Sequence, residues 1–386
     1  MNTSPSLFEV FVSGMGIMHI TLPEIAMILI SLLLAYLAIV KKYEPLLLLP
    51  ISFGMLIANI PLANLSAHTE GLMNILYQGI AIGLYPPLIF LCIGALTDFG
   101  PLIKSPKSAL IGLGGQLGIF TALGLALLVS RGLATVIPDF EAFTIREAAA
   151  IGIIGSSDGP TAIYLTRTLA QDLLPIIAIA AYSYMALIPL IQPPIMRLLT
   201  TEKERLVRMP AVVNATRRQK IIFPIALTIL TLLLVPAAGP LIAMLMLGNL
   251  LKESGVANRI VRTLQEELLN ILTLLIGLSI GATATAARIM DPRTLVIIVL
   301  GLIAFCFGTV GGILIAKLLC FITRGKINPL IGNSGVSAMP MAARVSQKVA
   351  QEYDPQNHLL MHAMGPIVAS TLGSAIIAGI FIAILG

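Results

Sequence analysis

Long apolar stretches separated by short polar segments cover almost the whole chain. A helix of roughly 17–25 predominantly apolar residues can cross the hydrocarbon core of a bilayer. The pattern therefore predicts an all-α polytopic membrane protein with no soluble domain between its spans. The predicted spans are residues 21–40, 45–60, 73–96, 108–129, 173–199, 221–234, 237–251, 268–286, 294–322 and 359–385.

Two segments, residues 145–170 and 327–350, interrupt this pattern with glycine, proline and small polar residues. Proline removes a backbone donor and clashes with the preceding helical turn, and glycine permits dihedral angles that other residues avoid. Unwound backbone at membrane depth is tolerated only where it is buried in protein or lines a watery cavity. We therefore expect both segments to be broken or re-entrant helices.

Three short patterns occur twice, in the same order along the chain. They are Gly54-Met-Leu-Ile-Ala-Asn59 with Met244-Leu-Met-Leu-Gly-Asn249, Ile93-Gly-Ala-Leu-Thr-Asp-Phe99 with Ile280-Gly-Ala-Thr-Ala-Thr285, and Ile154-Gly-Ser-Ser-Asp-Gly159 with Ile331-Gly-Asn-Ser-Gly335. This duplication predicts a first membrane repeat at residues 21–200 and a second at residues 221–386. A basic cytoplasmic loop at 201–220 would join them, and an interfacial helix at 1–20 would precede them.

The placement of basic residues suggests that the two repeats are inverted. If both interrupted segments re-enter the face that they leave, most basic span ends become cytoplasmic, as loop topology requires. An inverted repeat with paired broken segments is typical of transporters whose site lies near the bilayer midplane. A static bundle with an old duplication would also explain the symmetry, but not why both matched segments are polar and rich in glycine.

The composition excludes other classes of protein. Of the 386 residues, 57% are hydrophobic and 11% are charged, whereas about 25% charged residues is usual in soluble domains. The net charge of +6 does not indicate nucleic-acid binding, because the cations lie at span ends without interleaved aromatic residues. Cys92, Cys306 and Cys320 lie in or at the end of apolar spans, so we interpret them as packing residues and not as a disulfide set or a metal site.

Asp158 is a lone carboxylate between two apolar stretches of the first interrupted segment. An aspartate at the centre of a membrane helix costs roughly 2.5–3.5 kcal/mol on insertion scales, so such groups are usually paired, face a cavity, or handle a cation or a proton. Asp158 is therefore the central candidate for function. The alternative is a kinked helix in which Asp158 makes a purely structural hydrogen bond.

The second interrupted segment offers amide and hydroxyl oxygens from Asn328, Asn333, Ser334 and Ser337, and Gly332 exposes a backbone carbonyl. These oxygens suit hard, weakly bound cations. Combined with the single carboxylate of the first segment, they would form a cage with one formal negative charge, which suits Na⁺ better than a divalent ion. Serine and glycine also permit close helix packing in membranes, and this alternative is strongest for Ser334.

Tyr182 and Tyr184 lie inside a predicted span and not at its ends, where aromatic residues usually gather in membrane proteins. A phenol in this position can donate a hydrogen bond or relay a proton. Core packing would account for one of the two, which we take to be Tyr182. Gln192-Pro-Pro194 is expected to break the same span near its cytoplasmic end.

Two further groups carry weaker signals. His358 and His362 are spaced as a metal pair on one helix face, but no glutamate lies between them and no third ligand is evident. Asp98 closes an apolar span before a Gly-Pro pair, where a helix-end carboxylate is ordinary.

Long blocks of the chain resemble a known family. The blocks are Gly155-Ser-Ser-Asp-Gly-Pro-Thr161, Ala181-Tyr-Ser-Tyr-Met-Ala-Leu-Ile-Pro-Leu-Ile-Gln-Pro-Pro-Ile195, Gly248-Asn-Leu-Leu-Lys-Glu-Ser-Gly255, Asn328-Pro-Leu-Ile-Gly332, Met339-Pro-Met-Ala-Ala-Arg-Val-Ser346 and Met361-His-Ala-Met-Gly-Pro366. They resemble the membrane-embedded beta subunit of the sodium-pumping, biotin-dependent decarboxylases. That family includes the oxaloacetate, methylmalonyl-CoA and glutaconyl-CoA decarboxylase pumps.

The resemblance implies a division of labour within a complex in the inner membrane of a prokaryote. An alpha subunit, with carboxyltransferase and biotin-carrier functions, would load CO₂ onto biotin, which is not bound covalently to this chain. The beta subunit would decarboxylate the carboxybiotin and move Na⁺ outward while a proton is consumed. A small gamma or delta membrane subunit and a homo-oligomeric arrangement of the beta subunit are also implied.

The resemblance further implies which residues handle sodium and protons. They are Asp158, Tyr184, Asn328, Gly332 and Ser337. Together with the residues chosen from the pattern, the candidate catalytic residues are Asp158, Tyr184 and Ser337. The candidate sodium ligands are Asp158, Tyr182, Asn328, Gly332, Asn333 and Ser337.

The chain departs from the family pattern at two places. Gly155-Ser-Ser-Asp-Gly-Pro160 stands where the family usually has Gly-Gly-Ala-Asp-Gly-Pro, which keeps the carboxylate and adds hydroxyls. The family's Gly-Pro-Asn near the C-terminus is Gly365-Pro366-Ile367 here, so Ile367 cannot supply an ion ligand and Ser370 could substitute for it. Without the resemblance, a secondary Na⁺/H⁺ antiporter or an organic-anion symporter with no biotin partner would fit the same residues, as would a structural subunit with no ion path.

Overall fold

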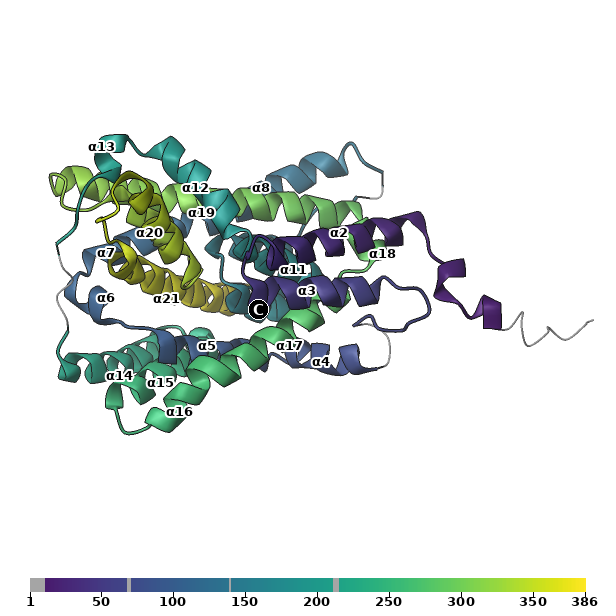
Figure 1. Cartoon of the computed structure of the whole chain (residues 1–386), viewed down its shortest axis with the longest axis horizontal. Coiled ribbons are helices and arrows are strands. Elements are labelled where there is room, and N and C mark those ends of the chain that lie inside the picture. Colours follow the sequence, from purple (N-terminus) through teal and green to yellow (C-terminus); the bar gives the residue numbers. More distant parts are fainter. Residues whose placement is uncertain (1–10, 68–70, 139, 211–214) are drawn as a thin grey trace, which may run out of the picture. The chain divides into compact units, whose positions relative to one another are not determined.

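The computed structural model describes residues 11–67, 71–138, 140–210 and 215–386. Every regular element in these residues is a helix, which confirms the predicted fold class (Figure 1). Residues 1–10 of the predicted interfacial helix lie outside the described part. The chain divides into two compact units: unit 1 contains Met1–Ile82 and Ile271–Leu295, and unit 2 contains Gly83–Asn270 and Val296–Gly386.

Unit 1 is built from short and medium helices at both ends of its sequence range. It holds η1 Gly16–Met18, α2 Leu22–Ile39, α3 Pro45–Ala58, α4 Leu72–Ala81, most of α17 Leu269–Thr283, and α18 Ala286–Ile289. The first long helix begins where the sequence provides a cap. The N–H and the hydroxyl of Thr21 both donate to Glu24, at 2.7 and 2.8 Å, which satisfies donors that a helix start leaves unpaired.

Unit 2 contains both interrupted segments. Its helices before residue 200 are α5 Tyr85–Leu96, α6 Gly100–Lys104, α7 Lys107–Gly115, α8 Leu117–Ala134, α9 Ile145–Gly152, η2 Ile153–Ser156, α10 Gly159–Leu169, η3 Gln171–Leu173, α11 Leu174–Ala186 and α12 Ile188–Leu199. Those after residue 200 are α13 Glu202–Arg205, α14 Arg217–Leu234, η4 Pro236–Ala238, α15 Gly239–Ser254, α16 Asn258–Thr263, η5 Leu264–Leu268, most of α19 Pro292–Ile322, η6 Pro329–Gly335, α20 Met341–Tyr353 and α21 Leu360–Leu385.

Among the described residues, five helices are long and apolar enough to cross a membrane, and two further pairs of helices pass the same test only when each pair is taken as one broken span. The five are Leu22–Ile39, Lys107–Ala134, Asn258–Thr283, Pro292–Ile322 and Leu360–Leu385. The protein is therefore an integral membrane protein, as the apolar pattern predicts.

Two predicted spans are pairs of helices bent by more than 40° at a short break. The span predicted at 73–96 is divided between α4 and α5 at Gly83, whose φ of +77° is a conformation that glycine adopts readily. The span predicted at 173–199 is α11 followed by α12, bent by 64° at Leu187. Our expectation that Gln192-Pro-Pro194 makes this break is wrong, because Pro193 and Pro194 lie inside α12. The break instead precedes Pro189, which lies in the first turn of α12, where its missing N–H is harmless.

The duplicated patterns make the same contact twice. In unit 1, Gly54 of α3 approaches Gly281 of α17 so closely that a Cβ on Gly54 would lie 3.1 Å from the Gly281 Cα. In unit 2, Gly248 of α15 approaches α5 in the same way, and its Cβ would lie 2.0 Å from the Leu91 carbonyl oxygen.

The asparagines five residues after Gly54 and one residue after Gly248 also act alike. Asn59 donates to the Ala284 carbonyl at 2.8 Å, and Asn249 donates to the Thr97 carbonyl at 2.9 Å. In each unit, an asparagine side chain thus ties one helix to the end of its glycine-packed neighbour. This shared contact supports a duplication, and the inversion of the repeats and their bounds stay predictions.

Candidate functional site

Asp158 lies in the break between η2 and α10 and is only 5% exposed. Ser157 ends η2 in a left-handed conformation with φ of +57°, and Asp158 then acts as the N-cap of α10. The Thr161 N–H donates to Asp158 Oδ1 at 3.3 Å. Aspartate is among the preferred N-cap residues because its carboxylate satisfies an N–H that the first helical turn leaves free. The predicted structural hydrogen bond therefore exists, but it uses only one carboxylate oxygen.

The second carboxylate oxygen accepts a hydrogen bond from the other end of the chain. Ser374 of α21 donates through its hydroxyl to Asp158 Oδ2 at 2.8 Å. The Ser374 hydroxyl lies 3.3 Å from that of Ser337, which lies 3.1 Å from that of Ser370, and Gln116 Nε2 donates to the Ser370 hydroxyl at 2.9 Å. These five residues, Asp158, Ser374, Ser337, Ser370 and Gln116, form one polar chain, which we call the serine ladder.

The serine ladder has one arrangement of protons that favours an ionised Asp158. A hydroxyl has one proton to donate, and that of Ser374 is within reach of both Asp158 Oδ2 at 2.8 Å and the Thr371 carbonyl at 3.0 Å. When Ser374 donates to the ionised carboxylate, Ser337 can donate to Ser374 and Ser370 to Ser337, while Gln116 supplies an amide N–H at the far end. In this arrangement the donors point toward Asp158 and stabilise a negative charge there without placing a positive charge beside it.

The two interrupted segments meet at this place. The Ser337 N–H donates to the Ser156 carbonyl at 2.8 Å, so the backbone after η6 is tied to the backbone before Asp158. Both residues are buried, at 7% and 0% exposure. Unwound backbone from the two predicted breaks is thus paired within the protein, as it must be in a membrane.

Two residues next to Asp158, in sequence or in space, carry buried hydroxyls that have no hydrogen-bond partner in the described part of the chain. Tyr182 packs its ring against Gly159, where a Cβ would lie 2.5 Å from the ring, and the Tyr182 hydroxyl is buried and unpartnered. The Ser157 hydroxyl is also buried and unpartnered. Unsatisfied buried polar atoms are rare in native proteins and call for an explanation such as an ion or a water. Tyr182, which we expected to be core packing, is therefore the tyrosine that lies beside the aspartate.

Tyr184 is held away from this group. Its hydroxyl donates a short hydrogen bond to the Ile298 carbonyl of α19, and its ring lies against Gly301. Tyr184 thus closes a contact between α11 and α19, and no hydrogen bond joins it to the serine ladder in the part of the chain that the structure describes.

The remaining candidates of the second segment are buried but are engaged elsewhere. Asn328 donates to the carbonyls of Arg205 and Val207 at 3.0 and 2.8 Å, and accepts from the Leu330 N–H at 2.9 Å. It therefore anchors the loop after α13. Gly332 packs against α19, where a Cβ would lie 2.5 Å from the Gly312 carbonyl oxygen.

Asn333 and Ser334 differ in how completely they are satisfied. Asn333 donates to the Ala342 carbonyl at 3.1 Å, while its Oδ1 is buried and unpartnered. The Ser334 hydroxyl lies 3.3 Å from that of Ser346. Ser334 thus contacts another serine of the same segment, and Asn333 has an oxygen without a partner in the described ranges that could serve as a ligand.

The sequence did not predict three residues at the site. Gln116 and Ser374 belong to the serine ladder, and Ser156 accepts a hydrogen bond from the Ser337 N–H. Ser370 and Ser374 are four residues apart on α21, so they lie on one helix face, and this spacing is a readable signal. Ser370 was expected only as a substitute for the ligand missing at Ile367, and it does join the group. Gln116 gave no local signal, because it lies among glycines at the junction of α7 and α8.

No lysine, arginine or histidine makes an ion pair with Asp158 among the described residues. Within the same residues, no three His, Cys, Asp or Glu side chains come together as a metal cluster, so His358 and His362 gain no third ligand. The group around Asp158 is therefore a set of neutral oxygens with one carboxylate, which suits a monovalent hard cation.

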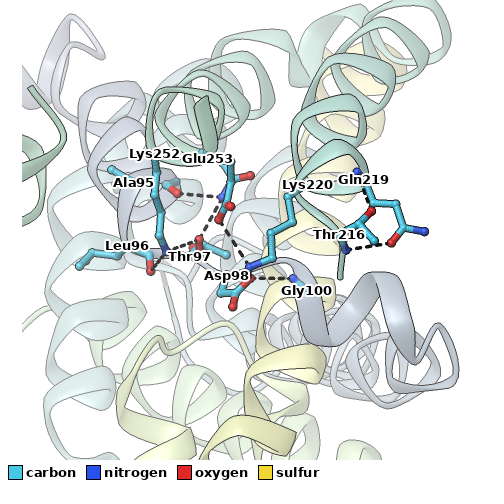
Figure 2. A network of polar contacts seen from close by, with 12 residues as sticks. Ala95, Leu96, Thr97, Asp98, Gly100, Thr216, Gln219, Lys220, Lys252 and Glu253 are labelled. Atoms are coloured by element: carbon cyan, nitrogen blue, oxygen red, sulfur yellow. Dashed lines mark hydrogen bonds and ion pairs between the residues drawn. The ribbon is translucent and has the colours of Figure 1, made fainter. Parts of the chain in front are cut away.

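Asp98, between α5 and α6, has a different setting (Figure 2). Lys220 of α14 donates to Asp98 Oδ1 at 2.7 Å, and the Gly100 N–H donates to the same oxygen at 2.8 Å. Lys252 of α15 donates to the Thr97 carbonyl at 2.9 Å, at the C-terminal end of α5 where a cation is favourable. Burial alone would raise the pKa of Asp98, but these hydrogen bonds and the charges of Lys220 and Lys252 hold it below its usual value.

Comparison with known proteins gives one consistent result. Residues 23–385 match the model of a family described as "Na+-transporting oxaloacetate decarboxylase beta subunit". The chain is 48% identical to oxaloacetate decarboxylase beta chain 2 of Salmonella typhi, over 96% of each chain. It is 48% identical to methylmalonyl-CoA decarboxylase subunit beta of Propionigenium modestum, over 97% of this chain and 98% of the other. It is also 48% identical to glutaconyl-CoA decarboxylase subunit beta of Acidaminococcus fermentans, over 96% of each.

Proposed function

Because this chain belongs to the family of Na⁺-transporting oxaloacetate decarboxylase beta subunits, we propose that it decarboxylates carboxybiotin on a partner and couples this step to outward Na⁺ transport with uptake of a proton. The observation that carries the proposal is the setting of Asp158. Its carboxylate is buried at the junction of the two broken segments and, among the described residues, is held by neutral donors. Intramembrane carboxylates without a cationic partner mark ion pathways and proton relays.

The transported ion would bind where the neutral oxygens converge. Asp158 supplies the charge, and the hydroxyls of Ser157, Tyr182 and Ser374 are the nearest candidates for further ligands. Ser337 supports this set through Ser374. Asn333 belongs to the same segment as Ser337 and has a buried Oδ1 without a partner among the described residues, so it could add a ligand. Asn328 and Gly332 are engaged elsewhere, and their ligand roles would require the segment to rearrange.

Proton transfer would follow from competition for one carboxylate. A cation next to Asp158 favours its ionised form, and a dry, empty site favours its protonated form. Sodium entering from the cytoplasm would therefore displace a proton, and the nitrogen that loses CO₂ from carboxybiotin must gain one. The serine ladder offers hydroxyls along which such a proton can pass. Tyr184 would act as a relay only after its hydroxyl leaves the Ile298 carbonyl.

The proposed complex contains partners that this chain does not encode. A carboxyltransferase and biotin-carrier alpha subunit would deliver carboxybiotin from the cytoplasm, and a small gamma or delta subunit would accompany the beta subunit in the bilayer. The basic loop at 201–220 faces the same side in this arrangement. A secondary antiporter or symporter would need neither partner, and membership in the decarboxylase family favours the pump.

The test is sodium uptake by the complete complex in inverted membrane vesicles. We expect decarboxylation of the acid substrate to drive Na⁺ uptake that avidin inhibits, and Asp158→Asn to abolish this uptake while biotin carboxylation by the partner persists. Asp172→Asn is the matched control, since Asp172 is exposed and lies outside the site. Sodium-stimulated turnover that survives Asp158→Asn would refute the assignment, and uptake that avidin leaves unchanged would favour the antiporter.

A further inference from the structure

A cavity of about 270 Å³ lies in unit 2, where the loop between α6 and α7 meets the start of α21. Its polar lining comes from Lys104, Lys326, His362, Ser105 and Ser108. No aspartate or glutamate is among its lining residues. Cations and hydroxyl donors that converge without an acid form a site for an anion.

The two lysines are available for a ligand. Neither Lys104 nor Lys326 makes an ion pair or a side-chain hydrogen bond with another residue in the described ranges. Both are exposed, so the cavity is reached from the surface. The basic ends at Lys104 and Lys326 belong to the face that the charge distribution assigns to the cytoplasm.

The rest of the lining is apolar. Pro101, Ile111, Ile327 and Ile331 contribute to it. An apolar lining with a few polar groups is usual for small-ligand sites, whose volumes begin at roughly 300 Å³. At about 270 Å³ the cavity lies just below this range, so it suits the end of a ligand that combines a compact ring with one carboxylate, and not a whole large ligand.

The position of the cavity links it to the serine ladder. The helices α7 and α21 are packed together (Figure 1), and Gly365 of α21 lies against Ser108 of α7 at the cavity. Further along the same two helices, Gln116 donates to Ser370. At 1.5 Å per helical residue, these ladder residues lie only about 8–12 Å along the helices from the cavity.

We propose that this cavity binds the carboxylated ureido ring of carboxybiotin, with Lys104 and Lys326 pairing with its carboxylate. This inference rests on the proposed function. The apolar lining holds the bicyclic ring. The Ser105 hydroxyl donates to or accepts from the ureido group, and the Ser108 hydroxyl, which donates to the Ser105 carbonyl at 2.6 Å, accepts from it. When the N–C bond to the carboxylate breaks, CO₂ leaves and the electron pair stays on the ureido nitrogen. That nitrogen then takes the proton that Asp158 releases. The proton would pass along the serine ladder, whose end at Gln116 and Ser370 is the part nearest to the cavity.

The test uses the intact complex and free N-carboxybiotin as the added substrate. We expect the double variant Lys104→Gln/Lys326→Gln to raise the KM for N-carboxybiotin by about tenfold or more, because each lysine supplies a charge-assisted bond to the carboxylate. The Na⁺ concentration for half-maximal rate should stay within twofold of the wild-type value. Lys107→Gln and Arg324→Gln are the controls, since both cations are exposed near the cavity in sequence but do not line it.

A second measurement does not depend on turnover. In Lys104→Cys, alkylation of the new thiol by a small anionic reagent should slow by at least about fivefold in saturating N-carboxybiotin, and the wild-type background from its own cysteines is subtracted. An unchanged KM in the double variant, or no protection of the thiol, would overturn the assignment. If the KM instead follows the phosphatidylglycerol content of nanodiscs and the double variant loses this dependence, the cavity holds a lipid headgroup and the assignment is also wrong.

These outcomes separate the inference from the proposed function. If the wild-type complex does not decarboxylate N-carboxybiotin in a sodium-dependent way, the proposed function fails. If it does, and the double variant behaves like the wild type, only the cavity assignment fails.

Discussion

Two aspartates of unit 2 lie at helix breaks, and their surroundings are opposite. Asp98 is bound by Lys220 at 2.7 Å, with Glu253 and Lys252 close by, so protein cations neutralise its charge permanently (Figure 2). Asp158 is more deeply buried, and in the part of the chain that the structure describes it accepts hydrogen bonds from the Thr161 N–H and the Ser374 hydroxyl and makes no ion pair. A protein that needed Asp158 only for structure could have paired it in the same way. The difference supports the proposal that a transported cation neutralises Asp158.

Among the variants that test the contrast between the two aspartates, we expect the largest effect from Ser374→Ala, on the affinity for sodium. Ser374→Ala removes the side-chain hydroxyl that donates to Asp158 Oδ2 at 2.8 Å. A hydrogen bond to a charged group contributes about 1.5–3 kcal/mol, so the Na⁺ concentration for half-maximal transport should rise by about tenfold or more. The measurement is the sodium dependence of decarboxylation by the complex.

Ser346→Ala is the matched control for this prediction. Ser346 is a buried α20 serine whose hydroxyl lies 3.0 and 3.1 Å from the carbonyls of Leu330 and Ala342, to either of which it can donate, and no hydrogen bond joins it to Asp158 among the described residues. Its sodium dependence should stay within about twofold of the wild-type value. Equal sodium dependence in the two variants would show that Ser374 does not act on the ion.

A smaller effect is expected at Asp98, and on stability instead of transport. Asp98→Asn removes the partner of Lys220 and weakens the tie between α14 and the turn after α5. We expect a loss of about 1 kcal/mol in the free energy of unfolding, because the pair is half-buried and partly screened by solvent. Thermal unfolding of the detergent-solubilised protein measures this loss. Sodium affinity should not change, and a tenfold change would contradict the contrast between the two aspartates.

The smallest effect is the acid dependence of that stability. The pKa of Asp98 is held below its ordinary value, so the stabilisation is complete above the unfolded-state pKa of about 3.9 and is lost as the pH falls through the lower folded-state pKa. The difference in unfolding temperature between wild type and Asp98→Asn should therefore be constant from pH 7 to pH 5 and shrink below about pH 4. If the difference in unfolding temperature instead grows as the pH falls, the pKa of Asp98 is raised and not lowered in the folded protein.

Sequence reasoning predicted the fold class and both broken segments because their signals are local. Apolar length, and proline or glycine inside an apolar run, are read directly from neighbouring residues. The break at Leu187 was misplaced by a few residues, because two prolines inside α12 were tolerated while Pro189 in the first turn of α12 set the boundary. The local sequence does not show which of these prolines lies at the helix boundary, because that depends on how the helices pack.

The site was predicted in part for the same reason. Asp158 is conspicuous as a charge in an apolar stretch, and the meeting of the two breaks follows from the duplicated pattern. Ser374 and Gln116 are ordinary polar residues in apolar helices, and their roles come from contacts across 216 and 254 residues of sequence. The choice between Tyr182 and Tyr184 depends on which helix face meets Gly159, which the alternation of residues in α11 does not reveal.

The most direct test of the central claim is whether Asp158 binds sodium. The unfolding temperature of the purified protein should rise with NaCl relative to choline chloride at equal ionic strength, because a ligand that binds only the folded state stabilises it. We predict this rise for the wild type and for Asp98→Asn, and its absence in Asp158→Asn. An undiminished sodium-dependent rise in Asp158→Asn would contradict the account.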